Sequence, residues 1–188
     1  MSADPQVPSP RREELLELAY AYVLRNGMAA MSLRPLAEAV GSSPRVLLYL
    51  FGSKDGLVQA LLARSRTEEL ALLADVRAAG GGPADVLDRL WEWLAAPHRR
   101  DLLRLWAEGY ARSVVEPDGP WAGFAAQSVH DWIDVLAEVL GPAGDPTAVL
   151  ATLRGALLDL LATGDEERTR AGVRAGLQQG GLTPVQPE

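Results

Sequence analysis

"SLRPLAEAVGSSPRVLLYLFGSKDG", residues 32–56, decides the fold of this chain, because it places two short apolar-periodic segments on either side of a small turn. The apolar spacing predicts one helix over residues 33–40 and another over residues 44–51. Helices this short are not stable alone in water. We therefore expect each to cover the apolar side of the other and to pack on a longer helix.

Residues that favour helix ends stand at the borders of both segments. Ser32 and Ser43 are suited to the N-cap positions, where a hydroxyl accepts a hydrogen bond from a free backbone N–H group. Pro44 occupies the first helical position, which proline prefers. Gly41 follows the first segment, where a positive φ ends a helix at low cost.

The second segment presents two different sides. Leu47, Leu50 and Phe51 share an inward side, whereas Arg45 and Tyr49, four residues apart, share an outward side. Two short helices joined by a turn that contains glycine, and supported by a longer helix, form a helix-turn-helix. A guanidinium and a phenol on the outer side of such a helix fit the major groove of DNA.

The whole chain has the pattern of an all-α protein, because apolar residues recur at intervals of three and four and β-branched runs are scarce. Glycine and proline mark the breaks, most clearly at Gly80-Gly81-Gly82-Pro83. The expected helices, in chain order, span residues 10–25, 33–40, 44–51, 54–79, 83–96, 98–115, 120–140, 146–162 and 165–178.

The charge is distributed unevenly over the chain. The net charge is −7 over 188 residues, which argues against a protein that coats nucleic acid along its whole surface. Residues 1–64 hold seven basic and six acidic residues, whereas residues 65–188 hold eleven and nineteen. The first third can therefore hold a DNA-reading unit without strong repulsion from the phosphates.

The composition also bears on the compartment. The chain has no cysteine, which excludes disulfides and thiolate metal sites and fits a reducing compartment. Its first ten residues are polar and rich in proline, unlike a secretion leader. The late apolar stretch is interrupted by Arg154 and Asp159 and falls short of the roughly 20 residues of a membrane span. We expect a cytoplasmic protein that contacts no membrane.

Residues 11–64 resemble the DNA-binding domain of the TetR family of bacterial regulators. The matching features are "RREELLELAYAYVLRNG", "SLRPLAEAVG", "SSPRVLLYLF" and "GSKDGLVQALL", in that order. The remaining two-thirds is similar only in architecture. The resemblance implies that the helix over residues 44–51 enters the major groove and that Lys54 approaches a phosphate, which suits a cation at a helix N-terminus. The residues predicted to contact DNA are Arg34, Ser43, Pro44, Arg45, Tyr49 and Lys54.

Two positions depart from the family pattern. Leu48 stands where a tyrosine is usual, and Leu50 stands where a histidine or tyrosine is usual. The phosphate contact expected from the first is therefore lost. Tyr49 either replaces it or touches a base edge, and the sequence leaves both roles open.

The resemblance also implies a domain order. The predicted units are a flexible segment over residues 1–10, a helix-turn-helix domain over 11–64, a helical ligand-binding and dimerisation domain over 65–180, and a flexible tail over 181–188. All five tryptophans lie beyond residue 90. Core packing accounts for most such aromatics, and the alternative is a cavity for a small molecule. The residues predicted to line that cavity are Trp106, Tyr110, Trp121, Phe124 and Gln127.

Apolar stripes on the helices expected over residues 120–140 and 146–162 indicate a homodimer, in which both helices pack against their two-fold copies. The predicted interface residues are Trp132, Ile133, Leu136, Leu150, Leu153, Leu157 and Leu160. A monomer that buries both helices internally is the alternative. A dimer would set two reading helices about 34–36 Å apart on a pseudo-palindromic site.

These patterns predict a transcription regulator that responds to an unknown small molecule; a repressor is the favoured form, and the sequence leaves activation open. The alternative is a small-molecule-binding or catalytic helical protein whose helix-turn-helix is only structural. The catalytic version lacks cysteine and has only His98 and His130 for imidazole chemistry. No enzyme activity, metal or cofactor is predicted.

Overall fold

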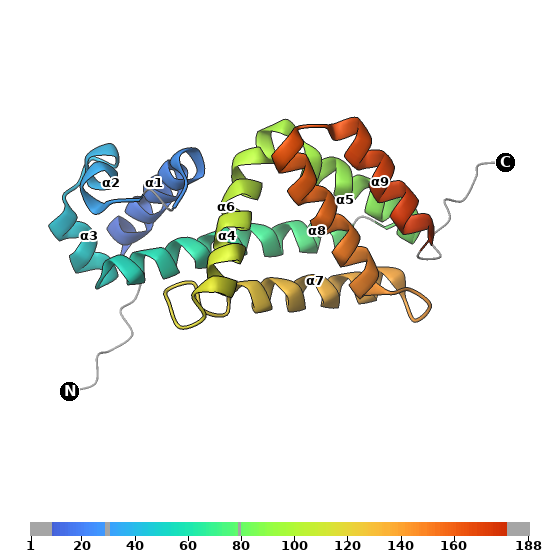
Figure 1. Ribbon diagram of the computed structural model, residues 1–188. Helices are drawn as coiled ribbons and strands as arrows, with labels where there is room; N and C mark the ends of the chain where they lie inside the picture. The colour runs from blue at the N-terminus through green and yellow to red at the C-terminus, as the bar shows by residue number, and fades with distance from the viewer. Residues whose placement is uncertain (1–8, 29–30, 79, 180–188) are drawn as a thin grey trace.

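The computed structural model describes residues 9–28, 31–78 and 80–179, and over these ranges the chain is helical with no strand. The helices are α1 (Pro10–Asn26), α2 (Leu33–Ala39), α3 (Pro44–Phe51), α4 (Lys54–Ala78), α5 (Pro83–Ala95), the 3₁₀ turn η1 (Pro97–Arg99), α6 (Arg100–Val115), α7 (Phe124–Leu140), α8 (Pro146–Thr163) and α9 (Glu166–Gln179). Figure 1 shows α1, α2 and α3 at one end of α4, and α5 to α9 around its other end. The predicted all-α architecture is confirmed. Apart from Ser9 and Pro10, the predicted flexible ends lie outside the described residues.

Capping residues fix the start of several helices. The hydroxyl of Ser43 accepts a hydrogen bond from the backbone N–H of Val46 at 3.3 Å, as expected for the cap of α3. Ser32 occupies the N-cap position of α2, but its side chain forms no capping hydrogen bond. The cap prediction is therefore correct for Ser43 and wrong in its chemistry for Ser32.

Two predicted helix starts are corrected by the structure. The helix expected from residue 120 begins at Phe124, because residues 117–123 form turns and Gly123 adopts a positive φ of 77°. Pro117, Gly119 and Pro120 disfavour a continuous helix in that segment. The helix expected from His98 begins at Arg100, after the separate turn η1.

α4 joins two hydrophobic cores. Its first half contributes Leu57 and Leu61 to a core built mainly from α1, α2 and α3, and its second half contributes Leu72 and Leu73 to a core built from α5 to α9. The boundary proposed between residues 64 and 65 therefore falls inside a continuous helix. The first core also receives residues from the second part of the chain: Leu105, Trp121 and Phe124.

Most of the predicted dimer residues are buried within their own chain. Trp132, Leu136, Leu150, Leu153, Leu157 and Leu160 are at most 6% exposed and belong to the second core, and Ile133 is half-buried beside them. Buried side chains of one chain are not available to a second copy. The stripes of α7 and α8 that were assigned to the dimer are thus the inward faces of these helices.

The outer face of α8 is unusual for an exposed helix. By length and composition α8 is apolar enough to cross a membrane, yet only 28% of it is buried. The exposed positions along one side are Ala148, Ala151, Gly155, Leu158 and Ala162, which include no charged residue. α8 therefore has a core-facing side and a second apolar side that the described residues leave uncovered.

Candidate functional site

α3 stands clear of its neighbours with its polar side chains outward. Leu47 and Phe51 anchor it in the first core, and its axis meets that of α4 at 69°. Arg45 is exposed and Tyr49 is 80% exposed, the highest value among the large apolar side chains of the described residues. The geometry that the spacing predicts for this helix is therefore present.

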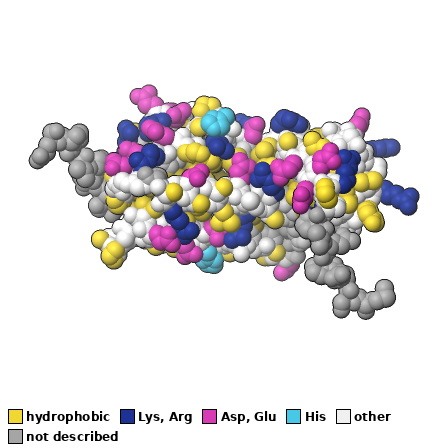
Figure 2. Space-filling model, turned by 180° about the vertical axis from the view of Figure 1, so that it is seen from behind, with side chains coloured by type: hydrophobic (Ala, Val, Ile, Leu, Met, Phe, Trp, Pro, Cys, Tyr) yellow, Lys and Arg dark blue, Asp and Glu magenta, His cyan; other side chains and the backbone are white. Residues whose placement is uncertain are grey.

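Free positive charge surrounds α3. Arg34 on α2, Arg45 on α3 and Lys54 at the start of α4 are exposed, and none forms an ion pair or side-chain hydrogen bond with a described residue. Figure 2 shows basic side chains projecting from the end of the molecule that carries α2 and α3. Arginines elsewhere are commonly bound to acids, as Arg66 is to Asp131 at 2.9 Å. Cations left without a protein partner can meet phosphates.

The other candidates near α3 have mixed roles. Pro44 is exposed, whereas the hydroxyl of Ser43 is already engaged in capping the helix. Val46 and Leu48 are each 39% exposed and widen the apolar part of the outer face. Arg12, on α1, donates a hydrogen bond to the carbonyl of Leu50 at 3.3 Å, so it ties α1 to α3.

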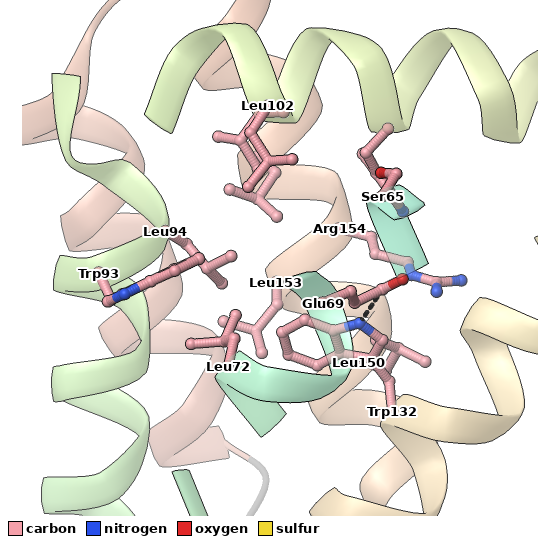
Figure 3. A pocket seen from close by; sticks show the side chains of 13 residues that line it. Ser65, Glu69, Leu72, Trp93, Leu94, Leu102, Trp132, Leu150, Leu153 and Arg154 are labelled. Atoms are coloured by element: carbon pink, nitrogen blue, oxygen red, sulfur yellow. Dashed lines mark hydrogen bonds between the residues drawn. The ribbon is translucent and has the colours of Figure 1, made fainter. Parts of the chain in front are cut away.

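A cavity of about 50 Å³ lies among the helices of the second part. Its wall is mainly leucine and tryptophan, contributed by α4, α5, α6, α7 and α8 (Figure 3). The lining residues are Ser65, Glu69, Leu72, Trp93, Leu94, Leu102, Leu103, Trp106, Trp132, Leu150, Leu153, Arg154 and Leu157.

Glu69 and Arg154 are the charged groups of this wall. The Oε1 atom of Glu69 accepts hydrogen bonds from the indole N–H of Trp132 and, at 2.9 Å, from the hydroxyl of Ser128. Burial raises the pKa of the Glu69 carboxyl, and these two hydrogen bonds oppose the rise. Burial lowers the pKa of Arg154, whose guanidinium donates to Tyr110 at 3.2 Å and to Ser128 at 3.1 Å.

A chain of polar contacts leads from the cavity wall to α1. The guanidinium of Arg99 lies over the ring of Trp93, with its carbon 4.0 Å from the centroid, and pairs with Glu68 at 3.3 Å. Glu68 accepts a hydrogen bond at 3.0 Å from the hydroxyl of Tyr20, a residue of α1 that is 3% exposed. The cavity and the helix-turn-helix are therefore in physical contact through side chains.

A family model described as "Bacterial regulatory proteins, tetR family" matches residues 15–61. The match begins in α1 and ends in α4, so it contains the complete helix-turn-helix described above. Residues 15–61 therefore match the helix-turn-helix part of the TetR family.

A curated TetR-family relative is the HTH-type transcriptional regulator BetI of Stenotrophomonas maltophilia, 28% identical over 111 residues. The match covers 57% of this chain and 57% of BetI, so the chain spans little more than half the length of this relative. A transcriptional regulator from Rhodococcus sp. Rha1 shares the fold, with a TM-score of 0.75 and 21% identity over 92% of this chain and 99% of that one. The multidrug binding protein EbrR, solved with proflavin, has a TM-score of 0.64 and 27% identity, over 88% of this chain and 99% of its own.

The cavity is lined by one of the five residues predicted to line it. Trp106 lines it, and Tyr110 lies next to it through its hydrogen bond with Arg154. Trp121 and Phe124 are instead buried in the first core, because the turns before α7 carry them toward α1 and α4. Gln127 is exposed and borders, with Phe124, a separate open hollow beside α4. The prediction is corrected for these three residues.

Sequence reasoning missed the two charged residues of the cavity wall and two of its tryptophans. Trp93 was assigned no role, and Trp132 was assigned to the dimer. Glu69 and Arg154 each interrupt an apolar helix side, and this interruption is the signal that could have found them. Among the described residues, no three His, Asp or Glu side chains gather as a metal site.

Proposed function

We propose that the protein is a cytoplasmic, ligand-responsive transcriptional repressor that binds a pseudo-palindromic operator as a homodimer. The observation that carries this proposal is the exposed α3, which presents Arg45 and Tyr49 among cations that have no partner in the described chain. The same chain holds an apolar cavity with two charged groups, which suits an effector site.

In the proposed complex, Arg45 contacts a base edge, guanine O6 and N7 being the commonest targets of arginine. Tyr49, four residues further along the same exposed side, contacts a base or the adjacent backbone. Lys54 meets a phosphate at the start of α4. Arg34 and the region of Ser43 and Pro44 follow the phosphate backbone, which positions the helix without reading sequence.

The proposed dimer uses the outer sides of α7 and α8. On α8 it buries the exposed stripe that includes Ala148, Ala151 and Leu158, the last of which is 51% exposed. On α7 it adds Ala137 and the half-buried Ile133, the one predicted interface residue that stays accessible. Small side chains allow helices of two copies to approach closely, and burial of this apolar area supplies the free energy of association.

The proposed response begins at the cavity wall. A ligand that displaces Trp93 moves Arg99 and Glu68, and so alters the contact of Glu68 with Tyr20 on α1. The proposed dimer has one conformation that binds the operator and one that does not. The ligand can change operator affinity only as far as its own affinities for these two conformations differ. EbrR, which shares this fold, is described as a multidrug binding protein and was solved with imidazole, proflavin and ethidium, which supports a ligand-binding role for this protein.

The test is titration of the protein onto the DNA upstream of its own gene at two salt concentrations. Specific affinity that falls with salt, and that drops about 10- to 100-fold for Arg45→Ala, supports the proposal. Arg104→Ala is the control, because Arg104 is exposed on α6 and paired with Asp101 far from α3. Unchanged binding by Arg45→Ala and Tyr49→Ala would show that α3 does not read DNA, which favours a helix-turn-helix with only a structural role.

The dimer is tested separately by Leu158→Asp. A charge in the centre of the proposed interface should give a folded monomer in analytical ultracentrifugation, together with loss of operator binding. Leu18→Asp, a change at a 44% exposed leucine of α1, is the control and should remain dimeric. A dimer that persists in Leu158→Asp would refute the outer face of α8 as the interface.

A further inference from the structure

The carboxylate of Glu69 has one engaged oxygen and one free oxygen. Oε1 accepts both hydrogen bonds, from Trp132 and Ser128. Oε2 accepts none from any described residue, although Glu69 lines the cavity (Figure 3). A carboxylate oxygen that has no protein donor can still accept a hydrogen bond, so the cavity offers an acceptor to whatever enters it.

Arg154 does not neutralise Glu69 by direct contact. No nitrogen of Arg154 lies within 4.0 Å of a described carboxylate, and its two terminal nitrogens are directed to Tyr110 and Ser128. The guanidinium carbon also lies 4.9 Å from the ring centroid of Tyr110 and 5.7 Å from that of Trp106. Two of the five N–H donors and one face of the guanidinium are thus engaged by Tyr110, Ser128 and the ring of Tyr110, which holds Arg154 away from direct contact with Glu69.

The rest of the wall suits an apolar body with a positive charge. Seven leucines and the indoles of Trp93, Trp106 and Trp132 accompany Glu69 on the wall. Aromatic faces attract cations, and a carboxylate in such a setting strengthens that attraction. Burial raises the pKa of the Glu69 carboxyl more than its two hydrogen bonds and the charge of Arg154 lower it.

We propose that the effector is a hydrophobic organic amine in its protonated form, with its nitrogen donating to Oε2 of Glu69 and its apolar body among the tryptophans and leucines. This inference rests on the proposed function for the consequence of binding, but not for binding itself. The cavity of about 50 Å³ is smaller than the roughly 150 Å³ that holds a benzene ring. A ring-sized amine must therefore part the leucine and tryptophan wall, which is the movement that a response requires.

The test uses three probes with nearly the same shape and different charge: benzylamine, benzyl alcohol and benzoate. Their binding to the wild-type protein is measured at neutral pH by quenching of tryptophan fluorescence and by calorimetry. We expect benzylamine to bind at least about tenfold more tightly than either other probe, the typical weight of a hydrogen bond to a charged group. Equal affinities, or tightest binding of benzoate, would overturn the inference without the need for any variant.

Glu69→Gln then identifies the residue. The amide keeps an oxygen for Trp132 and Ser128 but removes the charge, so the preference for benzylamine over benzyl alcohol should disappear. Asp75→Asn, an exposed change on the same helix, is the matched control and should keep the preference. A preference that survives in Glu69→Gln would overturn the assignment to Glu69.

Operator binding separates this inference from the proposed function. Benzylamine that binds through Glu69 without changing operator affinity supports the inference and contradicts the ligand-responsive function. A response to all three probes alike supports that function and contradicts the inference about charge.

Discussion

α3 and the cavity differ in how their functional side chains are brought together. α3 gathers Arg45 and Tyr49 from eight consecutive residues that one capped helix displays. The cavity gathers Glu69, Trp93 and Arg154 from three helices separated by more than eighty residues of sequence. Local spacing determines the first site, whereas the second exists only after α4, α5 and α8 have packed.

The two sites also differ in their polar chemistry. The cations around α3 are solvated and form no ion pairs with described residues, so they are available for an external anion. The charges at the cavity are partly desolvated and bound within the protein. Exposed cations such as those around α3 can thus be displayed at little cost in stability, whereas the partly buried carboxylate of Glu69 is ionised against the cost of burial.

The largest expected effect tests whether the two ends unfold as one unit. Leu136→Ala removes a side chain of α7 that is fully buried in the second core, and should lower the free energy of unfolding by about 2–5 kcal/mol. Because α4 belongs to both cores, the midpoint of urea denaturation should shift by the same amount whether unfolding is followed in α1 to α3 or in α5 to α9. Leu18→Ala, at an exposed leucine, is the control and should stay within about 1 kcal/mol of the wild type. Separate transitions for the two ends would show that α4 does not couple them.

A smaller effect tests the local origin of α3. Ser43→Ala removes the hydroxyl that caps this helix and should cost about 1 kcal/mol, seen as faster amide hydrogen exchange in α3 and as lower thermal stability. Ser32→Ala is a matched control, because Ser32 has the same N-cap position on α2 without a side-chain hydrogen bond. Equal losses of stability in the two variants would mean that the side-chain cap does not stabilise α3.

The smallest effect concerns the buried charge of the cavity and depends on pH. The pKa of Glu69 is higher in the folded than in the unfolded chain. Ionisation of Glu69 therefore lowers the free energy of unfolding, fully above the folded pKa and not at all at a pH where both states are protonated. Glu69→Gln should therefore raise the Tm at pH 7, and the gain should vanish near pH 3.

Asp159 provides a comparison of opposite sign, because the bonds from Arg168 lower the pKa of that exposed carboxyl. Its contribution to stability is present above the unfolded pKa and is lost as pH falls through the folded pKa. Asp159→Asn should therefore lower the Tm at pH 7, with a loss that shrinks on acidification. The same sign for both variants would contradict the environment described for Glu69.

The sequence predicted the helices to within a few residues wherever caps and breaks were clear. α3 begins and ends at the predicted residues, because Ser43, Pro44 and Gly52 favour one start and one end locally. α7 was placed four residues too early, because an apolar pattern continues through Trp121 while the turn residues around it override the pattern. Local signals thus decide boundaries best where cap chemistry and periodicity agree.

What the sequence by itself determined is the all-α fold and the outward side of α3, since the positions of Arg45 and Tyr49 relative to Leu47 follow from the pitch of one short helix. Only the tertiary structure decided which aromatics reach the cavity and which side of α8 is buried. The physical reason is that α8 is apolar on two sides, so periodicity cannot distinguish the side facing the core from the side left open. The packing of α7, α8 and α9 on α4 and α5 makes that choice, and with it brings Glu69, Ser128 and Arg154 together.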